Sequence, residues 1–275
     1  MPFVDDTRIP AQPYPELREV LARFVSDISA ELGDNLVGVY MIGSLAVGDF
    51  DLDSDVDFLV ITRHELNDAN IKALPEIMSG IQATGSYPAN HLEGSFIPLA
   101  DLNDPSIVGV KEFPYFDNGS TELERTTHDN QWHVRQVLRE SAVTLVGPMP
   151  ETFVEPVPAA AITAEMKTVM LRNLNAFAEE VSHPLSFWNS RFGQSFAVLT
   201  YCRKLLTLKT GEVRSKKAAA AWAKDTLDPK WRALIDQAWQ ERQGVRFMEK
   251  IRQRAGQALL DETLEFIKYT VSLIE

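Results

Sequence analysis

The segment that decides the fold covers residues 37–60 and reads VGVYMIGSLAVGDFDLDSDVDFLV. It predicts two buried strands, over 37–42 and 56–61, because both runs are apolar. Between them, glycine, serine and aspartate residues indicate an acidic turn. Residues i and i+2 of an extended chain project to the same face, so Asp55 and Asp57 are expected to point together at the start of the second strand.

Asp55 and Asp57 are candidate metal ligands. Two carboxylates held this closely repel each other unless a cation lies between them. Mg²⁺ favours hard oxygen ligands and usually binds one or two carboxylates together with substrate phosphates. Gly43 lets the backbone approach a phosphate, and the hydroxyl and amide of Ser44 are donors for its oxygens. The segment therefore predicts a site for magnesium and a phosphate group.

A third carboxylate, Glu93, lies in a strand expected over residues 90–99, with His91 and Ser95 on the same face. If that strand neighbours the 56–61 strand, Glu93 faces the same metal ions or accepts the proton of an attacking hydroxyl as general base. Three carboxylates around two Mg²⁺ ions stabilise in-line displacement at phosphorus. The other acids of the turn are interpreted as solvated loop residues: Asp49, Asp51 and Asp53.

The charge composition of the chain indicates which kinds of binding partner are favoured. The chain has 275 residues, and 39 acidic against 27 basic residues give a net charge of −12. This balance repels a nucleic-acid backbone and favours metal cations and polycationic small molecules. The sequence contains no run of about 18 apolar residues, so no membrane-spanning helix is expected. The N-terminus lacks a signal-peptide pattern, so no signal peptide is expected. The single cysteine, Cys202, is expected to be buried and inert in a cytoplasmic protein.

The remaining patterns predict the α+β class, a mixed sheet with flanking helices followed by a helical bundle. Prolines at 148, 150, 156 and 158 mark a boundary, so we expect domains at 1–150 and 151–275. In the first domain, helices are expected over 16–32, 68–82 and 130–140, and a last strand over 141–146. In the second domain, helices are expected over 161–181, 194–209, 215–225, 229–242 and 246–274.

Gly43-Ser44 followed by Asp55-x-Asp57 resembles the hallmark of the DNA polymerase beta-like nucleotidyltransferase superfamily. More closely, most of the chain resembles the streptomycin/spectinomycin adenylyltransferases of aminoglycoside resistance. Besides Glu93, the stretches that carry this resemblance are LRESAVTLVGPMP at 138–150, LTYCR at 199–203 and TGEVRSKKAAAAWA at 210–223.

The resemblance implies a nucleotidyltransferase domain and a helical domain that clamps substrate and nucleotide, with ATP and Mg²⁺ in the cleft between them. It implies that Ser44, Asp55 and Asp57 occupy the nucleotide and metal positions and that Glu93 is the catalytic base.

Two basic residues of the helical domain are also implied to reach the triphosphate. From the sequence alone, Arg203 and Lys216 are interpreted as ordinary charges on helix surfaces. The resemblance implies instead that both are phosphate ligands. Lys217 is the alternative to Lys216. The resistance enzymes hold the cationic drug with acidic and aromatic residues just before the Arg203 helix. Here that region, residues 187–196, has aromatic residues but no carboxylate, and it contains Arg191.

Three other residues have structural interpretations. Trp132 and Trp188 are able to stack on a substrate, but buried packing is the expected role. His133 has no second histidine or cysteine at ligand spacing, so we expect a structural histidine rather than a zinc ligand.

The leading hypothesis is transfer of AMP from ATP to an aminoglycoside hydroxyl with release of pyrophosphate, by a monomer in the cytoplasm. The first alternative is the same chemistry on another small-molecule or protein hydroxyl. The second alternative is an inactive nucleotide-binding regulatory module. The intact set of three carboxylates argues against that module.

Overall fold

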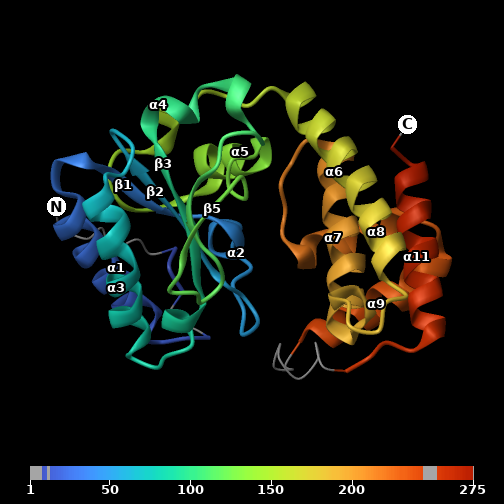
Figure 1. Cartoon of the computed structure of the whole chain (residues 1–275). Helices are drawn as coiled ribbons and strands as arrows, with labels where there is room; N and C mark the ends of the chain where they lie inside the picture. Colours follow the sequence, from blue (N-terminus) through green and yellow to red (C-terminus); the bar gives the residue numbers. More distant parts are fainter. Residues whose placement is uncertain (1–7, 11–12, 244–252, 275) are drawn as a thin grey trace. The chain divides into compact units, whose positions relative to one another are not determined.

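The computed structural model describes residues 8–10, 13–243 and 253–274. The chain divides into two compact units, Met1–Val157 and Pro158–Glu275. The first unit contains a sheet with helices, and the described part of the second contains helices only (Figure 1). The predicted α+β class is therefore confirmed.

The first unit is built on a six-stranded sheet with the order β5-β4-β3-β2-β1-β6. β2 and β3 are parallel, and all other neighbouring pairs are antiparallel. The strands are β1 (Leu36–Met41), β2 (Val56–Thr62), β3 (Leu92–Pro98), β4 (Phe113–Phe116), β5 (Leu123–Thr126) and β6 (Val143–Val146).

One face of this sheet packs on the core. Along β2, Val56, Phe58 and Val60 belong to the main hydrophobic cluster, and the residues between them point to the other face. Helices α1 (Leu17–Leu32) and α3 (Asp68–Gln82) cover the core face (Figure 1). The alternation of β2 therefore places Asp57 on the face turned away from α1 and α3.

Strands β4 and β5 form a hairpin that the sequence analysis did not predict. Pro114 lies inside β4, and proline removes a donor from the strand ladder. The pairing of β4 with β3 is confined to Phe116 and Tyr115, which oppose Gly94 and Ser95. Pro114 lies outside this short ladder, so its missing N–H leaves the β3–β4 pairing intact.

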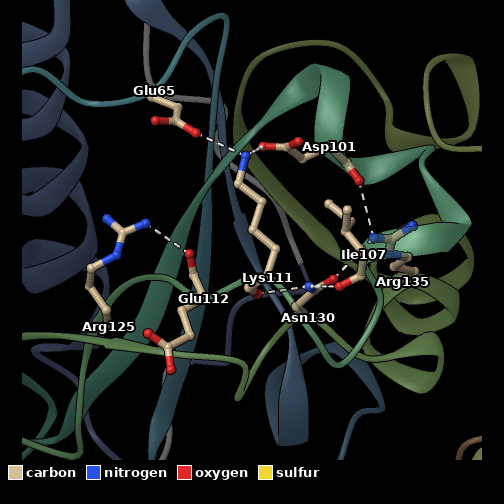
Figure 2. Close-up of polar contacts among 8 residues, drawn as sticks. All are labelled: Glu65, Asp101, Ile107, Lys111, Glu112, Arg125, Asn130 and Arg135. Atoms are coloured by element: carbon tan, nitrogen blue, oxygen red, sulfur yellow. Dashed lines mark hydrogen bonds and ion pairs between the residues drawn. The ribbon is translucent and has the colours of Figure 1, made fainter.

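A polar network holds the segments before and after this hairpin (Figure 2). Lys111 Nζ contacts Glu65 Oε1 and Asp101 Oδ2, each at 2.8 Å. Asn130 Nδ2 donates to the carbonyl oxygens of Ile107 and Lys111. Nearby, Arg125 donates to the carbonyl oxygen of Glu112.

Buried Arg135 completes the network. It donates to the carbonyl oxygens of Asp101 and Asp104 and to Asn130 Oδ1. Burial lowers the pKa of its guanidinium, and the charges of Asp104 and Asp101 oppose that shift. The network therefore fixes the segment around Asn130 against the loop that precedes β4.

The chain stays attached to the first unit beyond residue 150. Arg139, on α5 (Trp132–Ser141), donates to the carbonyl oxygens of Glu151 and Val154. Asn103 donates to the carbonyl oxygen of Phe153 and accepts from the amide of Glu155. These bonds explain why the compact unit extends to Val157.

The second unit packs its helices around α7 (Arg191–Thr210), which is buried on nearly all sides. Its neighbours are α6 (Ala159–Glu180), α8 (Lys216–Thr226), α9 (Arg232–Arg242) and α11 (Gln257–Ser272). Cys202 is buried in this core, as predicted, and burial raises the pKa of its thiol to about 12.

Several expected boundaries change in the structure. Helix α5 runs through Ser141, so β6 begins at Val143 rather than at 141. A 3₁₀ turn over Pro88–His91 precedes β3, so His91 lies before the strand rather than within it.

The two last helices also differ from expectation. The helix expected from 229 opens with a 3₁₀ turn, Pro229–Trp231, before α9. Of the helix expected over 246–274, residues 246–252 lie outside the described residues, and α11 begins at Gln257. Across the described ranges, no helix is both long and apolar enough to cross a membrane.

Candidate functional site

Gly43 brings the turn after β1 against β2. Its φ is 57°, a left-handed conformation that favours glycine, and it opens the short helix α2 (Gly43–Ala46). A Cβ atom at this position would overlap the Asp57 carboxylate. The backbone amide of Ile42 donates to the carbonyl oxygen of Asp57 at 3.0 Å. Only glycine therefore lets this turn approach the Asp57 side chain.

Asp57 and Glu93 are direct register partners on the parallel strands β2 and β3. Their side chains therefore share one face of the sheet, the face away from α1 and α3. Asp55 precedes the first residue of β2 and lies two positions before Asp57. The tertiary structure thus brings the three predicted carboxylates to one end of a parallel strand pair.

Glu93 lies in largely buried, negatively charged surroundings. Its side chain is 14% exposed, and the Tyr115 hydroxyl donates to Glu93 Oε1 at 2.5 Å. His128 Nε2 lies 3.5 Å from the same oxygen. Burial, followed by the negative charge of Asp57, raises the pKa of Glu93 to about 8, although the Tyr115 bond opposes this shift. A buried carboxyl with a raised pKa suits a group that accepts a proton.

A fourth acid, Asp129, lies near Glu93 on the same face. It is buried, and its Oδ2 accepts from Ser95 Oγ at 2.7 Å. Burial raises the pKa of Asp129, and the neighbouring His128 and His133 oppose this shift. Its position depends on the adjacent Asn130, which the network of Figure 2 fixes.

Asp55 is more accessible than Glu93, with 41% of its side chain exposed. Asn118 Nδ2 donates to Asp55 Oδ1 at 2.7 Å, and His91 Nδ1 lies 3.9 Å from the same oxygen. The ring of His91 stacks on Tyr87, which in turn stacks on Tyr14. These contacts hold the entrance to β2 in place.

Ser44 and the acidic turn complete the first-unit site. The Oγ atom of Ser44 is buried, and nothing in the described part of the chain hydrogen-bonds to it. In the turn, Asp51 Oδ1 accepts from the amide of Asp53 and from Ser54 Oγ. Asp51 thus closes the turn, while Ser44 presents a buried hydroxyl beside Gly43.

The donor set fits a divalent cation in its chemistry, because Asp57 and Glu93 are register partners and both supply hard carboxylate oxygens. Among the residues that the structure describes, no three His, Cys, Asp or Glu side chains converge closely enough to hold a metal ion. The carboxylates therefore supply suitable ligands but not a closed coordination shell.

In the second unit, Arg203 lies on α7, and Lys216 is the first residue of α8, next to Lys217. Arg203 is half-buried, and Lys216 Nζ lies 5.2 Å from the centre of the Phe196 ring. The structure therefore places each predicted cation at a helix surface within this unit.

The aromatic segment before Arg203 forms a cluster. Trp188 packs against Phe177, Phe187 and Phe196. Arg191 forms an ion pair with Glu241 and donates to Gln253 Oε1. The charge that Arg191 adds to this segment is thus matched by a carboxylate from α9.

Two family profiles match the chain. One, described as "Nucleotidyltransferase domain", matches residues 21–98, and the other, "Aminoglycoside adenylyltransferase, C-terminal domain", matches residues 152–269. A spectinomycin 9-adenylyltransferase from Staphylococcus aureus is 27% identical over 214 residues, which covers 74% of this chain and 76% of the relative. An aminoglycoside (3'') (9) adenylyltransferase from Shigella flexneri is 23% identical over 274 residues, 94% of this chain and 96% of the relative. The chain belongs to the aminoglycoside adenylyltransferase family.

A solved structure supports the same fold. Spectinomycin adenyltransferase from Enterococcus faecialis, solved with ATP and spectinomycin, matches with a TM-score of 0.67 at 15% identity. The match covers 93% of this chain and 99% of that chain. As a member of the adenylyltransferase family, this chain is an enzyme of the nucleotidyltransferase type.

Four residues around the predicted carboxylates were not expected from the sequence: Tyr115, Asn118, His128 and Asp129. For the first two, a signal exists in the aromatic run 113–116 followed by Asp-Asn-Gly, because Asn-Gly after such a run is typical of a hairpin turn. No local pattern indicates His128 and Asp129, since a loop carries them to Glu93.

A fifth missed residue, Lys204, follows Arg203 on α7. Burial, followed by the charge of Arg203, lowers the pKa of Lys204 to about 7. The sequence alone indicates an ordinary surface base at Lys204. Only the packing of α7 in the folded protein distinguishes its environment from that of Arg203.

Proposed function

We propose that this adenylyltransferase moves AMP from ATP to a hydroxyl group of an aminoglycoside and releases pyrophosphate. The observation that carries the proposal is the register pairing of Asp57 with Glu93, with Asp55 at the entrance to the same strand. This arrangement supports the proposal because the largely buried carboxyl of Glu93 lies near two carboxylates that we propose as magnesium ligands.

Glu93 is the proposed general base. Its raised pKa suits a group that takes the proton of the acceptor hydroxyl. The acceptor oxygen then forms a bond to the α-phosphorus, and the bond from that phosphorus to the bridging oxygen breaks. Pyrophosphate leaves with that oxygen, and the proton remains on Glu93 until solvent removes it.

Asp55 and Asp57 are the proposed magnesium ligands, with Glu93 as the third carboxylate available to two ions. Bound Mg²⁺ would neutralise the charge on the triphosphate and stabilise the in-line displacement. The buried Ser44 hydroxyl, beside the close turn at Gly43, is the proposed donor to a phosphate oxygen.

The choice of acceptor rests on two observations. The relatives named above act on spectinomycin or aminoglycosides, and the net charge of −12 favours a cationic acceptor. A different hydroxyl acceptor is the second candidate, because the aromatic segment 187–196 contains no carboxylate to hold a cationic drug.

Labelled ATP tests the proposal. Protein, Mg²⁺ and ATP labelled at the α-phosphate are incubated with streptomycin, spectinomycin and other aminoglycosides, and both pyrophosphate and labelled drug are measured. We expect drug-dependent release and a labelled drug product, both abolished by EDTA. Release only with other acceptors would favour the second candidate, and the absence of release with any acceptor would favour an inactive nucleotide-binding module.

Asp57→Asn is the companion variant. It should reduce turnover to background, because the site loses a metal-directed carboxylate, and should leave the circular dichroism spectrum unchanged. Asp27→Asn is the matched control, since Asp27 lies on α1 and pairs with Arg23 on the surface. Retained turnover in Asp57→Asn would rule out metal binding at that carboxylate.

A further inference from the structure

Tyr115 makes a short polar contact with Glu93. Its hydroxyl donates to Glu93 Oε1 at 2.5 Å. A second acceptor, Asp117 Oδ1, lies 3.3 Å away, beyond the usual range for a hydroxyl donor. The Glu93 bond is therefore the one that determines the direction of the phenol.

Neighbouring elements hold the phenol in this position. Tyr115 opposes Ser95 in the β3–β4 ladder, so it is a diagonal neighbour of Glu93 on the same face of the sheet. Its ring stacks on His128, with centroids 5.0 Å apart and an interplanar angle of 24°. The side chain is buried, and His128 precedes the fixed residue Asp129.

Tyr115 and His128 both approach the same oxygen of Glu93, Oε1. The bond from the phenol restricts rotation of the carboxylate about its last torsion, which is otherwise broad. A general base works only when the accepting oxygen is held within hydrogen-bond reach of the proton it takes. The contact with Tyr115 therefore orients the group that accepts the proton.

We propose that Tyr115 is a positioning residue that occupies Glu93 Oε1 and thereby presents Oε2 to the acceptor hydroxyl. This inference rests on the proposed function, because it assumes that Glu93 is the base. On this proposal, a residue of the β4–β5 hairpin takes part in positioning the base. Oε1 of Glu93 accepts the hydrogen bond from Tyr115, and Oε2 accepts the proton of the acceptor hydroxyl.

The main test is Tyr115→Phe, which removes the hydroxyl and keeps the ring on His128. We expect kcat to fall on the order of tenfold, the usual effect of losing a hydrogen bond to a charged group. The KM for ATP should change less than about twofold, because Tyr115 acts on the base rather than on the nucleotide. Tyr40→Phe is the matched control, since its hydroxyl donates to the carbonyl oxygen of Pro148 elsewhere in the same sheet.

A double-mutant cycle separates positioning from a merely structural role. In a Glu93→Gln background, Tyr115→Phe should produce little further loss of kcat, because the base it positions is already absent. A structural role would produce the same fractional loss in both backgrounds. Equal losses in both, or an unchanged kcat in the single variant, would overturn the inference.

Unfolding measurements separate failure of this inference from failure of the proposed function. The hydrogen bond predicts coupling between Tyr115→Phe and Glu93→Gln in denaturant unfolding, whatever the acceptor. If the protein transfers AMP to no aminoglycoside but the two substitutions are coupled, the proposed function is overturned and the Tyr115–Glu93 contact is supported. Absence of coupling would overturn the inference even if the wild-type protein modifies the drug.

Discussion

Glu93 shows how the surroundings of one residue set its chemistry. In an unfolded chain its carboxyl would ionise near pH 4.5, whereas in the folded protein burial and the charge of Asp57 raise its pKa to about 8. Between these two values the folded protein keeps a proton that the unfolded chain has released. The free energy of unfolding therefore falls as pH rises through this interval, as expected for a carboxyl whose folded pKa is raised.

Glu93→Gln tests this linkage in buffer without divalent cations. The variant carries no ionisable group at this position, so its free energy of unfolding relative to wild type should increase between pH 5 and pH 8. The expected increase is on the order of 1–4 kcal/mol, and urea unfolding at three pH values measures it. A difference that stays constant with pH would mean that Glu93 ionises in the folded protein as it does in the unfolded chain.

At the scale of elements, the site depends on the close approach of α2 to β2. This approach needs two properties of Gly43, a left-handed backbone and the lack of a side chain against Asp57. Gly48, at the other end of the same turn, has a φ of 75°, and a Cβ atom added there would meet no atom within 4 Å. Comparing alanine substitutions at Gly43 and Gly48 therefore separates the effect of backbone strain from the effect of crowding against Asp57.

Gly48→Ala should lower the free energy of unfolding by about 1 kcal/mol, because only the left-handed conformation is penalised. Gly43→Ala should lower it by about 2–4 kcal/mol and abolish turnover, because its methyl group also displaces Asp57. Denaturant unfolding and the labelled-ATP assay measure the two effects. Equal effects of the two substitutions would show that the approach of α2 to β2 is not tight.

The hairpin β4–β5 and the loop that follows it make a second contribution at this scale. They carry Tyr115, Asn118, His128 and Asp129 to the end of β2 and β3 where the predicted carboxylates lie. The Arg135 network fixes the loop end that bears Asp129. The β4–β5 hairpin and the loop after it carry no recognisable sequence motif, yet they surround the carboxylates that the sequence predicted.

At the scale of the whole molecule, each unit has its own hydrophobic core and its own set of proposed ligands. The first unit carries the carboxylates, and the second carries Arg203 and Lys216. Contact of these two cations with the triphosphate is a proposal that rests on the family resemblance.

Arg203→Gln tests this proposal. If Arg203 binds the triphosphate, the variant should bind ATP roughly tenfold more weakly in the presence of Mg²⁺, because one charged hydrogen bond is lost. Lys209→Gln is the matched control, an exposed base in the last turn of the same helix. Isothermal titration measures both affinities. Unchanged affinity in Arg203→Gln would exclude Arg203 as a ligand of the triphosphate.

The sequence by itself determined the fold class, the strands on either side of the acidic turn and the residue types of the site. Apolar runs, glycine at a turn and Asp-x-Asp at a strand start are local patterns, and the physics of a strand places Asp55 and Asp57 on one face without reference to the rest of the chain. Family resemblance then supplied the expected partners of that pattern, and the shared fold is confirmed.

Only the tertiary structure decided which carboxylates meet and what surrounds them. Asp57 and Glu93 are 36 positions apart in the sequence, and their pairing depends on the parallel register of β2 and β3. The contacts of Tyr115 and Asp129 depend on a hairpin and a loop that no periodicity marks. The physical reason is that register between distant strands is set by burial of whole faces, a property of the assembled sheet rather than of any local segment.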